Sequence, residues 1–211
     1  MKVAIIPVTP FQQNCTLVWD EETGKGVVID PGGDMDKILS VLEEEKIDVE
    51  RILITHGHID HVGGAVELRD ALDVDVEGPH EADRMLMERV ADQAIQFGLP
   101  SAKPCEPDRW LNEGDQVDIA GMSFDVLHCP GHAPGHVVFV NKDANFAIVG
   151  DVLFNGSIGR TDLPGGDHQT LLNSIRDKLL PLGDDVTFLC GHGNHSTIGE
   201  ERRNNPFLQG L

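Results

Sequence analysis

The chain has 211 residues, of which 40% are hydrophobic, and 36 acidic against 16 basic residues give a formal net charge of −20. This length and composition suit one folded domain spanning residues 1–211 and argue against a disordered protein. The acidic balance argues against binding to nucleic acid or to an anionic membrane. The start, MKVAIIPVTPFQQN, lacks the apolar region of a signal peptide, and no apolar run approaches the roughly 18 residues of a membrane span. We therefore expect a cytoplasmic protein.

The first half of the chain is expected to open with strands and then to mix helices with strands. The runs VAIIPV, NCTLVW and GVVID are rich in valine and isoleucine and predict three strands. Residues 34–46 carry apolar side chains at helical spacing, with Asp34 or Asp36 available as the N-cap. Further along, the pattern predicts a strand at 51–55, a helix at 65–72, a strand at 74–78 and a helix at 80–97.

The second half begins with a proline-containing loop over residues 98–115 and then returns to strands. QVDIA, MSFDVLH, HVVFV and NFAIVG predict four strands, and a glycine-rich loop at 155–167 leads to a helix at 168–180. VTFLC predicts the last strand, and a short helix is expected after Ser196. Strands gathered at both ends of the chain favour two sheets packed on each other with helices outside.

Four predicted strands end in polar residues of the same kinds. His56 follows RILIT, His132 follows FDVLHCP, Asp151 follows FAIVG, and His192 follows VTFLC. Functional residues concentrate in loops that a rigid scaffold positions, so we expect these strand ends to converge at one edge of the sheets.

The segment THGHIDHVGG, residues 55–64, has the highest density of metal-binding side chains in the chain. An extended loop can direct His56 and His58 to one point, and the turn that follows can direct Asp60 and His61 to a neighbouring one. Imidazole and carboxylate ligands without thiolate suit Zn²⁺, Fe or Mn. By contrast, Cys15, Cys105, Cys129 and Cys190 form no CxxC pair, so we expect free buried thiols in a reducing compartment.

The cluster resembles the HxHxDH motif of the metallo-β-lactamase superfamily, and the resemblance covers nearly the whole chain. Further segments match the superfamily in order: DPGG at 30–33, Gly131-His132, Gly150-Asp151 and Gly191-His192-Gly193. Within the superfamily the chain is similar to glyoxalase II, the hydroxyacylglutathione hydrolases, in the short bacterial form that ends soon after an E-x-x-x-N-P-F segment, here 201–207.

This resemblance implies an α+β fold, an αββα sandwich of two mixed β-sheets with helices on the outer faces. It also implies two divalent metal ions per chain, zinc in the first place, with iron or manganese as alternatives. One ion would be held by His56, His58 and His132. The other would be held by Asp60, His61 and His192, with Asp151 bridging the two.

The resemblance further implies hydrolysis of S-D-lactoylglutathione or a related small-molecule acyl thioester, a step of methylglyoxal detoxification. Metal binding lowers the pKa of water to about 7, which supplies a hydroxide for attack on the thioester. Asp60 is expected to bind one ion and to orient this water, and Arg160 to hold a substrate carboxylate. Longer glyoxalase II enzymes carry a C-terminal helical region with basic residues for glutathione, whereas this chain stops at Leu211. The oligomeric state stays open.

The remaining histidines are expected to play supporting roles. We expect His136 and His128 to support the ligands or to pack. His195 is expected in a loop, and His80 and His168 at helix starts.

Three alternative functions stay open on the sequence. A persulfide dioxygenase with a single iron shares the GRTD segment, but that branch has a cysteine where this chain has Ile158. A lactonase or β-lactamase would act on other acyl bonds. A non-catalytic metal or redox-partner module is disfavoured by the complete ligand set.

Overall fold

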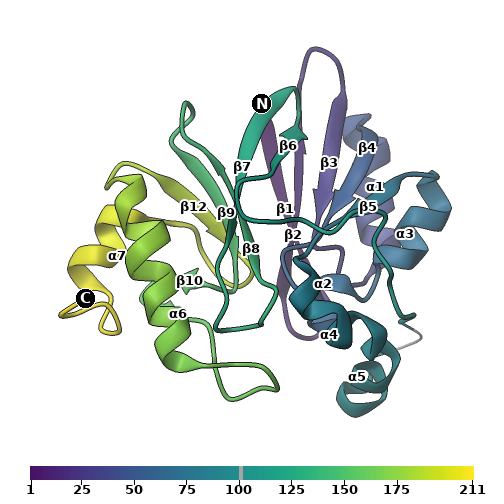
Figure 1. Cartoon of the computed structure of the whole chain (residues 1–211). Helices are drawn as coiled ribbons and strands as arrows, with labels where there is room; N and C mark the ends of the chain where they lie inside the picture. The colour runs from purple at the N-terminus through teal and green to yellow at the C-terminus, as the bar shows by residue number, and fades with distance from the viewer. Residues whose placement is uncertain (100–101) are drawn as a thin grey trace.

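Two β-sheets lie face to face, with helices on their outer faces, in the computed structural model of the chain, which describes residues 1–99 and 102–211. In Figure 1, α1 (Met35–Glu45) and α3 (Ala65–Leu72) lie outside one sheet, whereas α6 (His168–Ser174) and α7 (Ile198–Asn204) lie outside the other. The αββα sandwich of two mixed sheets predicted from the sequence is confirmed.

The first sheet has five strands in the order β1-β2-β3-β4-β5. The first three pair antiparallel, and β3, β4 and β5 pair parallel. Its strands are β1 (Lys2–Val8), β2 (Gln13–Trp19), β3 (Lys25–Ile29), β4 (Asp48–Leu53) and β5 (Asp75–Glu77). The short helices of this half are α2 (Ile59–Val62), η1 (Glu81–Asp83), α4 (Arg84–Glu88) and α5 (Val90–Phe97).

The second sheet has six strands in the order β13-β12-β9-β8-β7-β6, of which only β12 and β9 pair parallel. Its strands are β6 (Gln116–Ile119), β7 (Met122–His128), β8 (Val137–Asn141), β9 (Phe146–Gly150), β12 (Thr187–Cys190) and β13 (Ser196–Thr197). A small hairpin of β10 (Leu153–Phe154) and β11 (Ser157–Ile158) stands apart, and the π-helix η2 (Ile175–Leu179) and the 3₁₀-helix η3 (Leu180–Leu182) extend α6.

The apolar runs of the sequence are buried on both faces of the sheets. In β3, Val27 and Ile29 face the space between the sheets, whereas Val28 packs in the cluster under the outer helices. In β8, Phe139 packs between the sheets and Val138 against the other helical layer. Side chains alternate across a strand, so a strand covered on both sides needs an unbroken apolar run.

Two local expectations differ from the structure. The helix expected at 80–97 is split into η1, α4 and α5, with a break at Arg89, whose φ of −99° and ψ of 17° leave the helical region. Asp34 occupies the N-cap position of α1, but its side chain accepts from the Thr9 N–H and from Lys37 instead of capping the helix.

The predicted loop at 98–115 contains residues 100–101, which lie outside the described residues; its described part forms no helix or strand. Among the described helices, none has the length and apolar character to cross a membrane.

Candidate metal centre

The strand ends singled out in the sequence meet at one place. The residues predicted as ligands come from the loop after β4, from α2, from the loop after β7, from the end of β9 and from the loop after β12. The structure brings all of them together in overlapping groups of His and Asp side chains: His56, His58, Asp60, His61, His132, Asp151 and His192.

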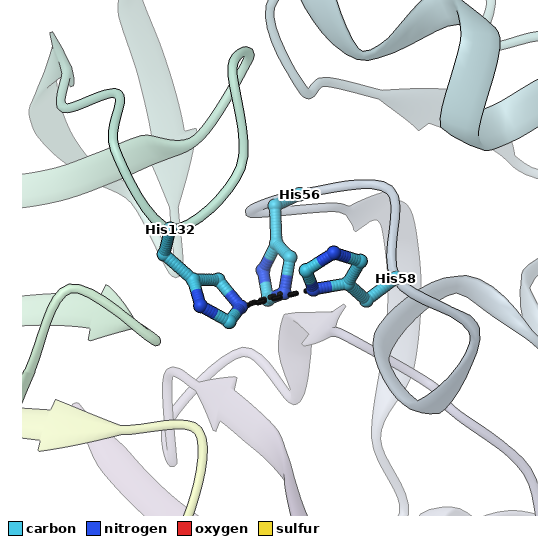
Figure 2. A group of neighbouring side chains, drawn as sticks. All are labelled: His56, His58 and His132. Atoms are coloured by element: carbon cyan, nitrogen blue, oxygen red, sulfur yellow. Dashed lines mark hydrogen bonds between the residues drawn. The ribbon is translucent and has the colours of Figure 1, made fainter. Parts of the chain in front are cut away.

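The first group consists of three histidines whose ring nitrogens converge (Figure 2). Nδ1 of His58 lies 2.9 Å from Nε2 of His132, and that atom lies 3.2 Å from Nε2 of His56. One ligand atom from each ring lies within 4.8 Å of the others. Such a triangle of nitrogens presents three donors to a single ion.

The second group consists of Asp60, His61 and His192, again with ligand atoms within 4.8 Å of one another. Asp151 stands between the groups. Its Oδ1 lies 3.4 Å from Nε2 of His61, and its Oδ2 lies 3.5 Å from Nε2 of His132 and 3.6 Å from Nε2 of His192. One carboxylate thus reaches ligands of both groups, which is the geometry of a bridging ligand.

Two buried polar atoms at this centre show that its residues fit a metal. Nε2 of His61 and Oδ1 of Asp151 are buried and have no hydrogen-bond partner among the described residues. Such orphaned atoms cost free energy unless something binds them. The backbone also makes room here, because a methyl group at Gly191 would lie 2.1 Å from Oδ1 of Asp151. Nitrogen and carboxylate donors without thiolate fit zinc, iron or manganese.

The second ring nitrogen of three histidines is held by a fixed partner. Nδ1 of His132 donates to the carbonyl oxygen of Arg160 at 2.8 Å. Nδ1 of His56 lies 3.0 Å from Oγ1 of Thr55, and Nδ1 of His61 lies 2.8 Å from Oδ2 of Asp30. These partners leave Nε2 of each ring facing the centre and hold the ring orientation, as the supporting residues of metal sites do.

The histidines of the first group are held neutral. Burial, and then the neighbouring imidazoles, lowers the pKa of His56 well below its ordinary value and that of His58 to about 3. Burial also lowers the pKa of His132. A neutral imidazole keeps the lone pair that a metal needs, so this group binds a cation without first releasing protons.

The second group instead attracts positive charge. Burial opposes protonation of His61, but the carboxylates of Asp151, Asp60 and Asp30 outweigh it and raise the pKa of His61 well above its ordinary value. Burial likewise opposes ionisation of Asp151, and His61 foremost among its neighbours lowers its pKa. A potential that favours a proton on His61 favours a divalent cation still more.

A buried carboxylate that the sequence reasoning missed ties the two ligand loops together. Asp83, at the junction of η1 and α4, accepts from the N–H of Gly57 at 2.8 Å and from the N–H of Gly135. Gln93 adds to this support, because its Oε1 accepts from the N–H of Ile59 at 3.1 Å. Asp83 is fully buried, and burial raises its pKa to about 6. No local sequence signal marks it, since its partners lie far along the chain.

The other histidines support the centre or lie away from it. His136 stacks on His56 with 4.6 Å between ring centroids, and its Nε2 accepts from the N–H of Asp151 at 3.0 Å. His128 stacks on His80, whose Nδ1 caps η1 by accepting from the backbone, and His195 lies in an exposed loop. These placements agree with the supporting, helix-start and loop roles expected from the sequence.

Arg160 lines the cavity over the centre, a space of about 500 Å³. Its guanidinium is paired with Asp162, at 2.7 Å from Nε to Oδ1 and 2.8 Å from a terminal nitrogen to Oδ2. Its carbonyl holds His132. A role for this side chain in holding a substrate carboxylate therefore stays a prediction.

The comparisons with known proteins agree with this geometry. The sequence profile of the metallo-beta-lactamase superfamily matches residues 8–192. The chain belongs to the metallo-β-lactamase superfamily. With a His/Asp cluster able to bind metal ions, it is a metallo-hydrolase of this fold.

Several known proteins are similar to this chain over nearly its full length. The hydroxyacylglutathione hydrolase GloC of Haemophilus influenzae is 49% identical over 209 residues, 99% of this chain and 98% of the relative. The crystal structure of BLEG-1 B3 metallo-beta-lactamase superposes with a TM-score of 0.92 at 37% identity, covering 99% of this chain and 100% of the other. That of TTHA1623 in a di-iron-bound form has a TM-score of 0.87 at 41% identity, covering 97% and 100%. The resemblance to the superfamily and to glyoxalase II is confirmed.

Proposed function

We propose that this chain is a glyoxalase II-like thioester hydrolase that cleaves S-D-lactoylglutathione or a related acyl thioester to the free acid and the thiol. The observation that carries the proposal is the pair of three-residue ligand groups with Asp151 between them. These residues would hold two adjacent divalent ions, an arrangement that would suit hydrolysis. The name of the 49% identical relative from Haemophilus influenzae supports the same substrate class.

We assign one divalent ion to His56, His58 and His132 and the other to Asp60, His61 and His192, with Asp151 as the shared ligand. Zinc is the metal proposed, since these donors suit it and hydrolysis needs no redox change. Bound there, two such ions supply Lewis acidity and lower the pKa of a bound water. The four cysteines are free and buried, which supports a reducing compartment, the cytoplasm.

Asp60 is the residue of this chain that we place next to the reaction. Its side chain is 16% exposed, lines the cavity and has Oδ2 at 3.2 Å from Nε2 of His192. Its carboxylate accepts a hydrogen bond from the attacking water and so orients the water oxygen toward the acyl carbon. The new C–O bond forms as the C–S bond breaks, sulfur leaves as a thiolate, and the proton that the water loses passes through solvent to the thiolate. A thiol pKa of about 8.5 makes thiolate a good leaving group without a strong general acid.

Arg160 is the cation that we propose for contact with an anionic group of the substrate, since it lines the same cavity. This contact requires exchange of the Asp162 carboxylate for that of the substrate.

The test assays the chain loaded with zinc and, separately, with iron, and includes a lactone and a β-lactam as alternative substrates of hydrolysis. Thioester hydrolysis is followed with S-D-lactoylglutathione and with simple acyl thioesters, and oxygen uptake is followed with glutathione persulfide. We expect thioester cleavage without oxygen uptake. Oxygen uptake by an iron-loaded chain that cleaves no thioester would instead show the mononuclear-iron dioxygenase activity. Hydrolysis confined to lactones or β-lactams would also contradict the proposal.

A further inference from the structure

The cavity over the candidate metal centre has apolar walls on both sides. One wall comes from the β1–β2 loop and from α4 and α5, and the other comes from β10, β11 and the loop after them. The side chains that form them are Phe11, Met85 and Phe97 on one wall and Phe154, Ile158 and Leu163 on the other.

The first wall exposes large apolar groups to solvent. Phe11 is 39% exposed, Phe97 42% and Met85 50%. The Phe11 and Phe97 rings meet edge to face with 5.7 Å between centroids, although they come from distant parts of the chain. An exposed apolar patch of this kind, continuous with a reaction centre, indicates a ligand whose own apolar surface covers it.

The cations of the cavity wall are already paired with carboxylates of this chain. Nε of Arg89 lies 3.3 Å from Asp92, and the Arg160 guanidinium makes two contacts with Asp162. The outer wall is therefore close to neutral, and charge is concentrated at the candidate metal centre, where the carbonyl group reacts. Among the described residues that line the cavity, no cation is left unpaired to receive the carboxylates of a peptide thiol such as glutathione.

Resting on the thioester hydrolase function proposed above, we propose a preference within it: the site takes thioesters whose larger substituent is uncharged and apolar, an aliphatic chain or an aromatic ring. That substituent lies between the wall of Phe11, Met85 and Phe97 and the wall of Phe154 and Ile158. The thioester carbonyl then lies at the candidate metal centre. Glutathione thioesters are the poorer substrates, because their charged arm meets apolar side chains and reaches the Arg160 guanidinium only by displacing Asp162.

The test compares two substrates with the same acyl group, S-benzyl thioacetate and S-acetylglutathione, on the zinc-loaded full chain. We expect kcat/KM to favour the benzyl thioester by about tenfold, within the range that a few apolar groups contribute to discrimination. In Phe97→Ala this ratio should fall about tenfold, because one side of the apolar wall is removed. Ile95→Ala is the matched control, since Ile95 is an 83% exposed side chain of the same helix that does not line the cavity. Its ratio should equal that of the wild type.

The outcomes separate this inference from the function on which it rests. If the zinc-loaded chain cleaves neither thioester, the hydrolase function itself fails. If it cleaves S-acetylglutathione better, or if Phe97→Ala keeps the wild-type ratio, the apolar preference is wrong while the hydrolase function stands. Should Phe97→Ala not fold, Met85→Ala removes a 50% exposed side chain of the same wall and carries the same expectation.

Discussion

We expect Asp83→Asn to weaken metal binding while it changes the stability of the fold only slightly at neutral pH. The Asp83 carboxylate accepts from the N–H groups of Gly57 and Gly135, one in each ligand loop. An Asn side chain keeps the size but has one acceptor oxygen, so its NH₂ group faces one of the two N–H groups. A buried donor left without a partner costs about 1–3 kcal/mol.

Asp83→Asn also removes a buried negative charge, which raises the free energy of unfolding of the variant. The pKa of Asp83 is raised from 3.8 to about 6 by burial, and this shift corresponds to about 3 kcal/mol at 1.36 kcal/mol per pH unit. Because the folded protein binds the proton more tightly than the unfolded chain, ionised Asp83 destabilises the fold as the pH rises through this window. The cost of the unpaired N–H group and the gain from removing the buried charge are similar in size. We therefore expect Asp83→Asn to change the free energy of unfolding by less than about 2 kcal/mol at about pH 7.

At about pH 4 the gain is largely lost, because most wild-type Asp83 is then protonated in the folded protein. The variant should be less stable than the wild type there by about 1–3 kcal/mol. Urea unfolding of the metal-free proteins at both pH values measures this. Zinc affinity, measured by competition with a chelator, should fall about 10- to 100-fold, as for other residues that hold ligands in place.

Asp118→Asn is the matched control for this prediction. Asp118 is exposed, and its Oδ1 accepts a single N–H, from Gly121 in the β6–β7 turn. In this variant the free energy of unfolding should change by less than about 0.5 kcal/mol, and the zinc affinity should not change. An Asp83→Asn variant with wild-type zinc affinity would refute the reasoning that this carboxylate positions the ligand loops.

Three further predictions follow from the same geometry. Asp60→Asn should lower kcat about 100-fold with little change in melting temperature, because it weakens the orientation of water; equal turnover at equal metal content contradicts this role. Asp162→Asn should free Arg160 and lower KM for S-acetylglutathione but not for S-benzyl thioacetate; an unchanged ratio of the two KM values argues against a substrate contact by Arg160. Burial raises the pKa of all four cysteine thiols, so they stay protonated and react slowly with iodoacetamide at about pH 8; labelling of the native protein as fast as of the urea-unfolded chain would contradict this.

The strand pattern and the positions of the candidate ligands could be predicted from the sequence. His56, His132, Asp151 and His192 each follow a strand that the apolar runs mark clearly. The ends of strands in packed sheets meet at one edge. The apolar pattern of each strand was therefore enough to predict that these four residues lie close together. The two-sheet architecture followed from the order of the elements, because strands are gathered at both ends of the chain with helices between them.

Features that depend on long-range contacts could not be predicted. Asp83 reads as an ordinary acid near a helix start, and its role appears only when residues 26 and 52 positions away close around it. The helix expected at 80–97 is divided into η1, α4 and α5, in which Asp83 contacts both ligand loops and Gln93 contacts Ile59. The Arg160–Asp162 pair was within reach of local reasoning, since only one residue separates the two, but helical and strand patterns carry no signal for it.

We propose that one chain holds two metal ions that act together on a thioester. The direct test is to titrate the metal-free chain with zinc and to record thioester hydrolysis at each metal content. We predict that activity per chain rises until two ions are bound and then stays constant, with little activity at one. Full activity at a single ion per chain, with no further increase at the second, would contradict the two-ion account.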